Sequence, residues 1–127
     1  MTEPAGNAIL TGAHALEIEK AKRRLEAGNG GYEIVHSSPG MEVGVYVLVA
    51  PEPDRQQPHE DDELYVVLEG RGELTVEGER VRLTEGEAVF VPAGAEHQFT
   101  GYECLSVLVI FARGATAADH PRRRSRP

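Results

Sequence analysis

Two short segments contain the residues of this sequence that could do chemistry. His59 and Glu63 lie four residues apart before a hydrophobic run, and His97 follows a glycine-containing turn further along the chain. If the first segment is extended, even spacing places His59 and Glu63 on one face of it. Two imidazoles and one carboxylate can hold a divalent metal and leave coordination positions open for another molecule. The residue types therefore predict a metal site with access for a small ligand.

A plainer interpretation of each residue stays open at this point. A single histidine is more often a surface or hydrogen-bonded residue than a metal ligand. The acidic run 60–63 could equally be a solvated turn. The spacing of the two segments taken together, rather than any one residue, favours the metal.

One helix and a series of strands must position these side chains. Residues 13–27 have helical periodicity, with Ala15, Ile18, Ala21 and Leu25 near one face, and a glycine-rich stretch ends the helix. After that stretch apolar residues alternate, and glycines and prolines separate the alternating runs. The expected strands cover residues 32–36, 41–50, 63–69, 73–77, 80–83, 88–91, 97–100 and 104–111. About eight short strands after one helix predict an all-β sandwich or barrel.

Several of the expected strands are apolar on both faces. In the strand at 41–50 the valines share one face, while Tyr46 and Leu48 share the other. The pattern leaves open which set faces the interior. Apolar residues on an outer face need the helix or a second subunit to cover them, so we expect a homodimer.

The bulk composition limits the class of protein. The 127 residues have a formal net charge of -8 and one cysteine, Cys104, which we expect to be buried. This length predicts one domain with a core that needs no disulfide. Residues 1–118 contain 20 acidic and 9 basic residues, so this body should repel nucleic acid and anionic membranes.

The two ends of the chain are predicted to lie outside the folded part. Residues 1–12 are expected to be disordered, and residues 113–127 to form a flexible basic tail. No secretory signal pattern is visible at the start, and the longest apolar run, 105–112, is too short to span a bilayer. With the single cysteine, these features predict a cytoplasmic protein.

The two ligand-bearing segments resemble the two motifs of the cupins, a family of small jelly-roll β-barrel proteins. The first motif of that family reads Gly-x5-His-x-His-x3or4-Glu-x6-Gly, and His59, Glu63 and Gly70 match its second half. The second motif reads Gly-x5-Pro-x-Gly-x2-His-x3-Asn. The residues that match it at the same spacings are Gly86, Pro92, Gly94 and His97. The resemblance implies a single jelly-roll barrel over residues 32–112, with a metal inside it held by the two histidines and the glutamate.

Three positions differ from the family pattern. Gln57 stands at the first histidine of the first motif, Pro51 at its opening glycine, and Gly101 at the closing asparagine of the second motif. Gln57 could ligate the metal through its amide oxygen, or it could leave a three-ligand site. These ligand types are compatible with Fe(II), Zn, Mn or Ni.

The resemblance implies a metal-dependent enzyme of the dioxygenase, isomerase or cyclase type that acts on a small oxygen-bearing molecule. Tyr65 lies two residues after Glu63, so it points to the same side and is a candidate proton donor. Phe99, two residues after His97, is expected to pack in the core. The alternative is a non-catalytic barrel that binds or senses a small molecule. A third hypothesis, a metal-independent sugar epimerase, would need His59 as base with Tyr65 or Tyr46 as acid.

Overall fold

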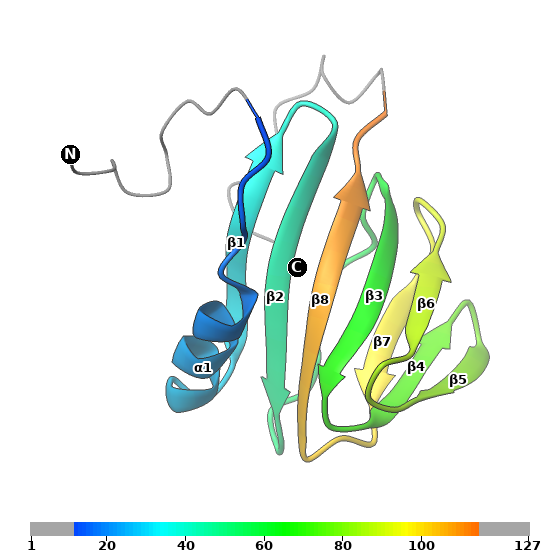
Figure 1. Cartoon of the computed structure of the whole chain (residues 1–127). Helices are drawn as coiled ribbons and strands as arrows, with labels where there is room; N and C mark the ends of the chain where they lie inside the picture. The colour runs from blue at the N-terminus through cyan, green and yellow to red at the C-terminus, as the bar shows by residue number, and fades with distance from the viewer. Residues whose placement is uncertain (1–11, 115–127) are drawn as a thin grey trace.

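One helix and eight strands form the part of the chain that the computed structural model describes, residues 12–114. In chain order these elements, shown in Figure 1, are α1 (Ile18–Ala27), β1 (Gly31–Ser38), β2 (Met41–Val49), β3 (Asp62–Glu69), β4 (Gly72–Val76), β5 (Glu79–Leu83), β6 (Ala88–Val91), β7 (His97–Thr100) and β8 (Cys104–Ala112). Each predicted strand is present. Runs of apolar or alternating residues, with the glycines and prolines that separate them, were therefore sufficient to locate the strands.

The strands form two antiparallel sheets with a common core between them. The larger sheet has the order β1-β2-β8-β3-β6, and the smaller sheet has the order β5-β4-β7. The chain passes from one sheet to the other after β3, β5, β6 and β7, and Figure 1 shows the smaller sheet beside β3 and β6. This arrangement confirms the predicted all-β jelly-roll barrel with one N-terminal helix.

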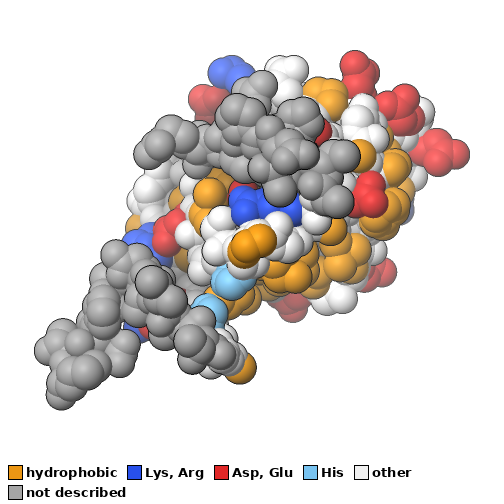
Figure 2. Space-filling view, turned by 90° about the horizontal axis from the view of Figure 1, so that it is seen from above, with side chains coloured by type: hydrophobic (Ala, Val, Ile, Leu, Met, Phe, Trp, Pro, Cys, Tyr) orange, Lys and Arg blue, Asp and Glu red, His pale blue; other side chains and the backbone are white. Residues whose placement is uncertain are grey.

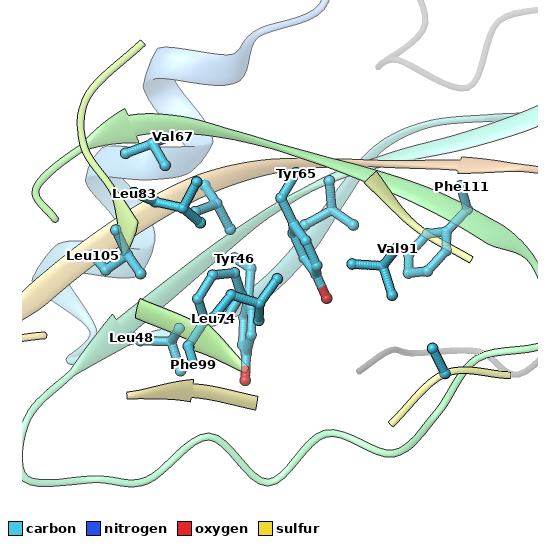
Figure 3. Packing of buried hydrophobic residues seen from close by; sticks show 13 residues of the cluster. Tyr46, Leu48, Tyr65, Val67, Leu74, Leu83, Val91, Phe99, Leu105 and Phe111 are labelled. Carbon is cyan, nitrogen blue, oxygen red and sulfur yellow. The ribbon is translucent and has the colours of Figure 1, made fainter. Parts of the chain in front are cut away.

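Inward side chains of both sheets fill the barrel, as Figure 3 shows. Tyr46 and Leu48 of β2 belong to this inner core, so the inner face of that strand is the aromatic one. The valines at 45 and 47 face outward and pack against the helix. The sequence left open which face of β2 points into the barrel. Strand pairing decides this, because Tyr46 lies opposite the buried Val107 of β8.

The helix α1 covers part of the outer face of the larger sheet. Ala21 is completely buried against the outer valines of β2, and Ile18 and Leu25 pack around it. The helix begins at Ile18 rather than at the predicted residue 13. Ile18 is the first residue of the stripe that packs on the sheet, whereas Ala15 is exposed. Residues before Ile18 therefore gain no burial from helix formation, and a short helix depends on such burial.

Two predictions near the ends of β8 need correction. Cys104 is exposed rather than buried, because it begins the strand and the buried residues start with Leu105. Arg113, which we assigned to the tail, donates hydrogen bonds to the backbone oxygen of Ser38 and to the carboxylate of Glu42. The last strand ends at Ala112, where we predicted the end of the barrel, and these hydrogen bonds hold Arg113 against it. Residues 1–11 of the predicted disordered start and residues 115–127 of the predicted basic tail lie outside the described residues.

Across residues 12–114, no helix is both long enough and apolar enough to cross a membrane.

Candidate metal centre

The two sheets bring the three predicted ligands to one point inside the barrel. Glu63 lies on the inner face of β3, opposite Phe111 of β8 and Val91 of β6. His97 is the first residue of β7 and lies in the smaller sheet. His59 comes from the loop that precedes β3. Strand pairing therefore positions two of the ligands, and a loop positions the third.

Hydrogen bonds hold the two motif segments side by side. The backbone N–H of Gly94 donates to the backbone oxygen of His59 at 2.7 Å, and that of Ala93 donates to Asp62 Oδ1 at 2.9 Å. Two of the four carboxylates in the acidic run 60–63 are buried. The run is therefore part of the barrel wall, and the interpretation as a solvated turn is wrong.

The ligand atoms of the three side chains converge. His59 Nδ1 lies 3.0 Å from Glu63 Oε1, and His97 Nε2 lies 3.1 Å from the same oxygen. One donor atom from each side chain lies within 4.8 Å of the other two. The side chains of His59, Glu63 and His97 are 7%, 1% and 0% exposed. The structure thus brings the predicted triad together as a buried cluster.

Hydrogen bonds and charge set the protonation of the cluster. His97 Nδ1 lies 2.8 Å from the backbone oxygen of Ala95, which can only accept, so in the neutral ring Nδ1 holds the proton and Nε2 holds a lone pair. Burial would lower the pKa of His97, but the Glu63 carboxylate outweighs it and raises that pKa. Burial would likewise raise the pKa of Glu63, but hydrogen bonds with His59 and His97 lower it. Glu63 is therefore ionised and attracts a proton or a cation.

Two buried atoms of the cluster have no hydrogen-bond partner among the described residues. They are His59 Nε2 and Glu63 Oε2. Because His59 Nδ1 faces a carboxylate oxygen and donates to it, Nε2 is an acceptor as well. A buried polar atom without a partner costs roughly 1–3 kcal/mol. A cation between these atoms would satisfy both, so the residues fit a divalent metal that accepts nitrogen and oxygen ligands.

Tyr65 lies directly beside the triad. Its hydroxyl donates to Gln56 Oε1 at 2.9 Å and lies 3.0 Å from His97 Nε2. Burial, and then the charge of Glu63, raise the pKa of Tyr65 well above its ordinary value. Its ring packs edge-on against Phe99, which is a core residue as predicted. Tyr65 therefore keeps its proton and is suited to donate a hydrogen bond.

The amide that contacts the triad is Gln56, which corrects our expectation for Gln57. Gln57 is exposed, whereas Gln56 Oε1 lies 3.2 Å from His97 Nε2. We named Gln57 because it stands at the first histidine of the family motif, and that histidine is two residues before His59. Residues 53–59 have no regular secondary structure, so the alternation of side chains does not apply there.

Sequence reasoning missed Asp54, a buried carboxylate in the same loop. Its Oδ1 accepts the hydroxyl of Tyr46 at 2.6 Å, and its Oδ2 accepts the N–H of Phe99 at 2.8 Å and Gln56 Nε2 at 2.6 Å. The only signal in the sequence is an acidic residue next to Pro53, which is also typical of a solvated turn. The contacts show that Asp54 instead joins the loop to both sheets.

A cavity of about 480 Å³ borders the centre at His97. Residues of the 54–58 loop, the turn after β4 and the start of β7 line it. The lining contains carboxylates and amides and has no lysine or arginine. Such a surface favours polar, uncharged or cationic groups over anions.

Backbone geometry explains two glycines of the motifs. Gly101, which replaces the asparagine of the family pattern, has a φ of 70°. Glycine and asparagine are the residues that adopt this left-handed region most readily, so the exchange is conservative for the backbone. Gly70, which matches the pattern, has a φ of 89°, and a Cβ there would clash with the backbone oxygen of Cys104.

Comparison with known proteins adds to these observations. Residues 45–111 match the family model described as the cupin domain. A protein of Streptomyces coelicolor described as uncharacterised is 37% identical over 99 residues, which are 77% of this chain and 94% of that protein. An acireductone dioxygenase of Leishmania major is 31% identical over 110 residues, which are 73% of this chain but only 32% of that enzyme.

A solved structure agrees with the sequence comparison. The TT1209 protein from Thermus thermophilus superposes with a TM-score of 0.63 and 29% identity, over 74% of this chain and 92% of that chain. The family model covers more than half of the sequence and includes both motif segments. The strand order, the paired motifs and the matched residues agree, and the chain belongs to the cupin family.

Proposed function

We propose that this cupin holds one divalent metal ion inside the barrel through His59, Glu63 and His97. The observation that supports the proposal is a buried group of acceptor atoms with too few protons. His59 Nε2 and Glu63 Oε2 have no partner among the described residues, and His97 Nε2 faces Glu63 Oε1 at 3.1 Å. Buried lone pairs repel one another unless a proton or a cation lies between them. Fe(II), Zn, Mn and Ni all suit these ligands.

The metal site would serve an enzyme that acts on a small oxygen-bearing organic molecule. A divalent metal held there would supply Lewis acidity or, as Fe(II), dioxygenase chemistry. Likeness to the acireductone dioxygenase of Leishmania major supports this class, although the chain spans about a third of that enzyme. Tyr65 would keep its proton and donate a hydrogen bond to a substrate oxygen. Isomerase and cyclase reactions fit the same residues.

Metal content tests the proposal. The chain would be purified without an affinity tag, incubated with Fe(II), Zn(II) or Mn(II), desalted and measured by elemental analysis. We expect about one metal per chain in the wild type, and loss of that metal in His59→Ala and His97→Ala. His36→Ala is the control, because the imidazole of His36 lies outside the cluster. A folded wild type that takes up none of the metals would contradict the proposal.

A second candidate function is a non-catalytic barrel that binds a metal or small molecule and senses it. The three ligand side chains are at most 7% exposed, and only His97 among them lines the cavity, which favours a site with little access for a substrate. Oxygen uptake with enolic or phenolic compounds separates the two functions. Uptake by the metal-loaded protein that is lost in His97→Ala supports the dioxygenase. A metal-loaded protein that neither consumes oxygen nor converts these compounds supports binding alone.

A further inference from the structure

We infer that Gln56 is a fourth metal ligand through its Oε1 atom and that Asp54 is the positioning residue that aims this oxygen at the site. The inference rests on the metal site proposed above and adds two residues to it. Gln56 Oε1 lies 3.2 Å from His97 Nε2, on the side of the triad where Tyr65 also lies. An amide oxygen is a neutral, hard ligand, so it would complete the site without changing its charge.

Asp54 decides which end of the Gln56 amide faces the triad. Asp54 Oδ2 lies 2.6 Å from Gln56 Nε2 and 2.8 Å from the backbone N–H of Phe99. An ionised carboxylate can only accept hydrogen bonds, so the NH2 end of the amide must face Asp54. The oxygen end is then turned toward His97 and Tyr65. Without the carboxylate, either end of the amide could face the triad.

The position of Asp54 is itself held from several directions. Its Oδ1 accepts the Tyr46 hydroxyl from β2 at 2.6 Å, and its backbone oxygen accepts Gln98 Nε2 from β7 at 3.0 Å. Asp54 is 3% exposed, so its side chain has few alternative conformations. A carboxylate tied to strands of both sheets is a rigid support, and rigid supports of this kind orient metal ligands.

The atoms around Gln56 Oε1 are short of protons. Tyr65 has a single hydroxyl proton, and three acceptors face it: Gln56 Oε1 at 2.9 Å, the Nε2 of neutral His97 at 3.0 Å and the Glu63 carboxylate. While His97 is neutral, whichever atom accepts this proton, the other acceptors are left without it. A cation among these atoms would satisfy the remaining acceptors. The competing role for Gln56 is to accept the Tyr65 proton and nothing more, and a measurement of metal affinity separates the two roles.

The affinity of the full chain for Zn(II) is the first measurement, by competition with a chromophoric chelator. Gln56→Leu keeps the approximate size of the side chain and removes its oxygen, and we expect the Kd to rise by about 10- to 100-fold. Gln57→Leu is the matched control, because Gln57 is the neighbouring amide and is exposed. Its Kd should equal that of the wild type.

Asp54→Asn tests the positioning role. The substitution replaces one acceptor oxygen by an NH2 group, so the Gln56 amide can turn its own NH2 group toward the cation. We expect the same rise in Kd as for Gln56→Leu. The double variant should bind no more weakly than either single variant, because both remove one interaction. The visible absorption of bound Co(II), which reports the ligand set, should change in the same way in all three variants.

Several results would overturn the inference, and they differ from failure of the metal site. If the wild type binds neither Zn(II) nor Co(II), the proposed metal site is wrong, and so is this inference. If the wild type binds both metals, and Gln56→Leu has the same Kd and the same Co(II) spectrum, the metal site stands but Gln56 is not a ligand. If the two increases in Kd multiply in the double variant, Asp54 affects metal binding independently of Gln56. If Asp54→Asn does not fold, Gln56→Leu and its Co(II) spectrum still decide the role of Gln56.

Discussion

His97 shows how one backbone contact prepares a side chain for metal binding. Its Nδ1 proton is held by the oxygen of Ala95, so in the neutral ring the Nε2 lone pair faces the Glu63 carboxylate. A proton on Nε2 would relieve this contact, and so would a metal. Protons and metal therefore compete for the same atoms, and metal affinity should rise with pH until His97 has lost that proton.

The stability of the metal-free protein should depend on pH through Glu63 and His97. Glu63 raises the pKa of His97, so the stability from their contact is fully present below the unfolded value of about 6.5 and is lost as pH rises through the folded pKa. The histidines lower the pKa of Glu63, so its contribution is lost as pH falls through that pKa, below about 4.3. The contact between Glu63 and His97 therefore stabilises the fold most between about pH 4.3 and about pH 6.5.

Denaturant unfolding of the metal-free protein at a series of pH values measures this effect. We expect the free energy of unfolding to fall as pH rises above about 6.5. Glu63→Gln has no carboxylate to hold a proton on His97, so its stability should change less over the same range. Identical pH profiles for the two proteins would show that the pair does not hold a proton in the folded state.

The helix α1 is fastened to the larger sheet by one buried lysine as well as by its apolar stripe. Lys22 is 7% exposed and donates to Glu69 Oε1 of β3 at 2.6 Å and to Glu26 Oε2 at 3.2 Å. Glu26 also accepts the hydroxyl of Ser106 on β8 at 3.1 Å. The hydrogen bond with Glu69 raises the pKa of Lys22. The positive residues of this helix therefore do not all form a solvated face.

Replacing Lys22 by methionine keeps the packing of its stem and removes its charge. We expect Lys22→Met to lower the free energy of unfolding by roughly 1–2 kcal/mol, since its partner Glu69 is still partly solvated. Lys20→Met is the matched control on the same helix, because Lys20 and its partner Glu17 are 69% and 67% exposed. It should give no measurable change in urea unfolding. Equal effects of the two substitutions would contradict the structural role of Lys22.

Over the whole molecule, the outer face of the larger sheet is covered unevenly. Figure 1 shows α1 beside β1 and β2, at the end of the sheet away from β6. Leu64 of β3 and Phe90 of β6 lie opposite one another and are 36% and 56% exposed. Figure 2 shows hydrophobic side chains gathered on one side of the molecule, with carboxylates around them. We propose that a second copy of the chain covers the Leu64–Phe90 surface.

Sedimentation of Phe90→Glu tests this arrangement. We expect a dimeric wild type and a folded, monomeric variant, because a carboxylate in an apolar contact between copies would be buried without a partner. Arg71→Glu is the control, since it introduces the same group at an exposed position in the turn after β3. A wild type that sediments as a monomer in dilute solution would end the proposal.

The strands, the turns and the three candidate ligands could all be read from the amino-acid sequence. Alternating side chains report the pleat of a single strand, and glycines mark turns that few other residues can adopt. These are local properties of the chain, so they do not depend on which strands become neighbours. The spacing of His59, Glu63 and His97 within the two motifs identified the candidate ligands in the same way, because each motif is a short stretch of the chain.

Other features were decided by contacts between distant segments. The inner face of β2 depends on its pairing with β8, and the helix begins where its residues first pack on the sheet. Gln56 replaces Gln57 at the site because Asp54, held by strands of both sheets, orients a loop that has no repeating geometry. A loop takes its conformation from what surrounds it, and only the folded barrel supplies those surroundings.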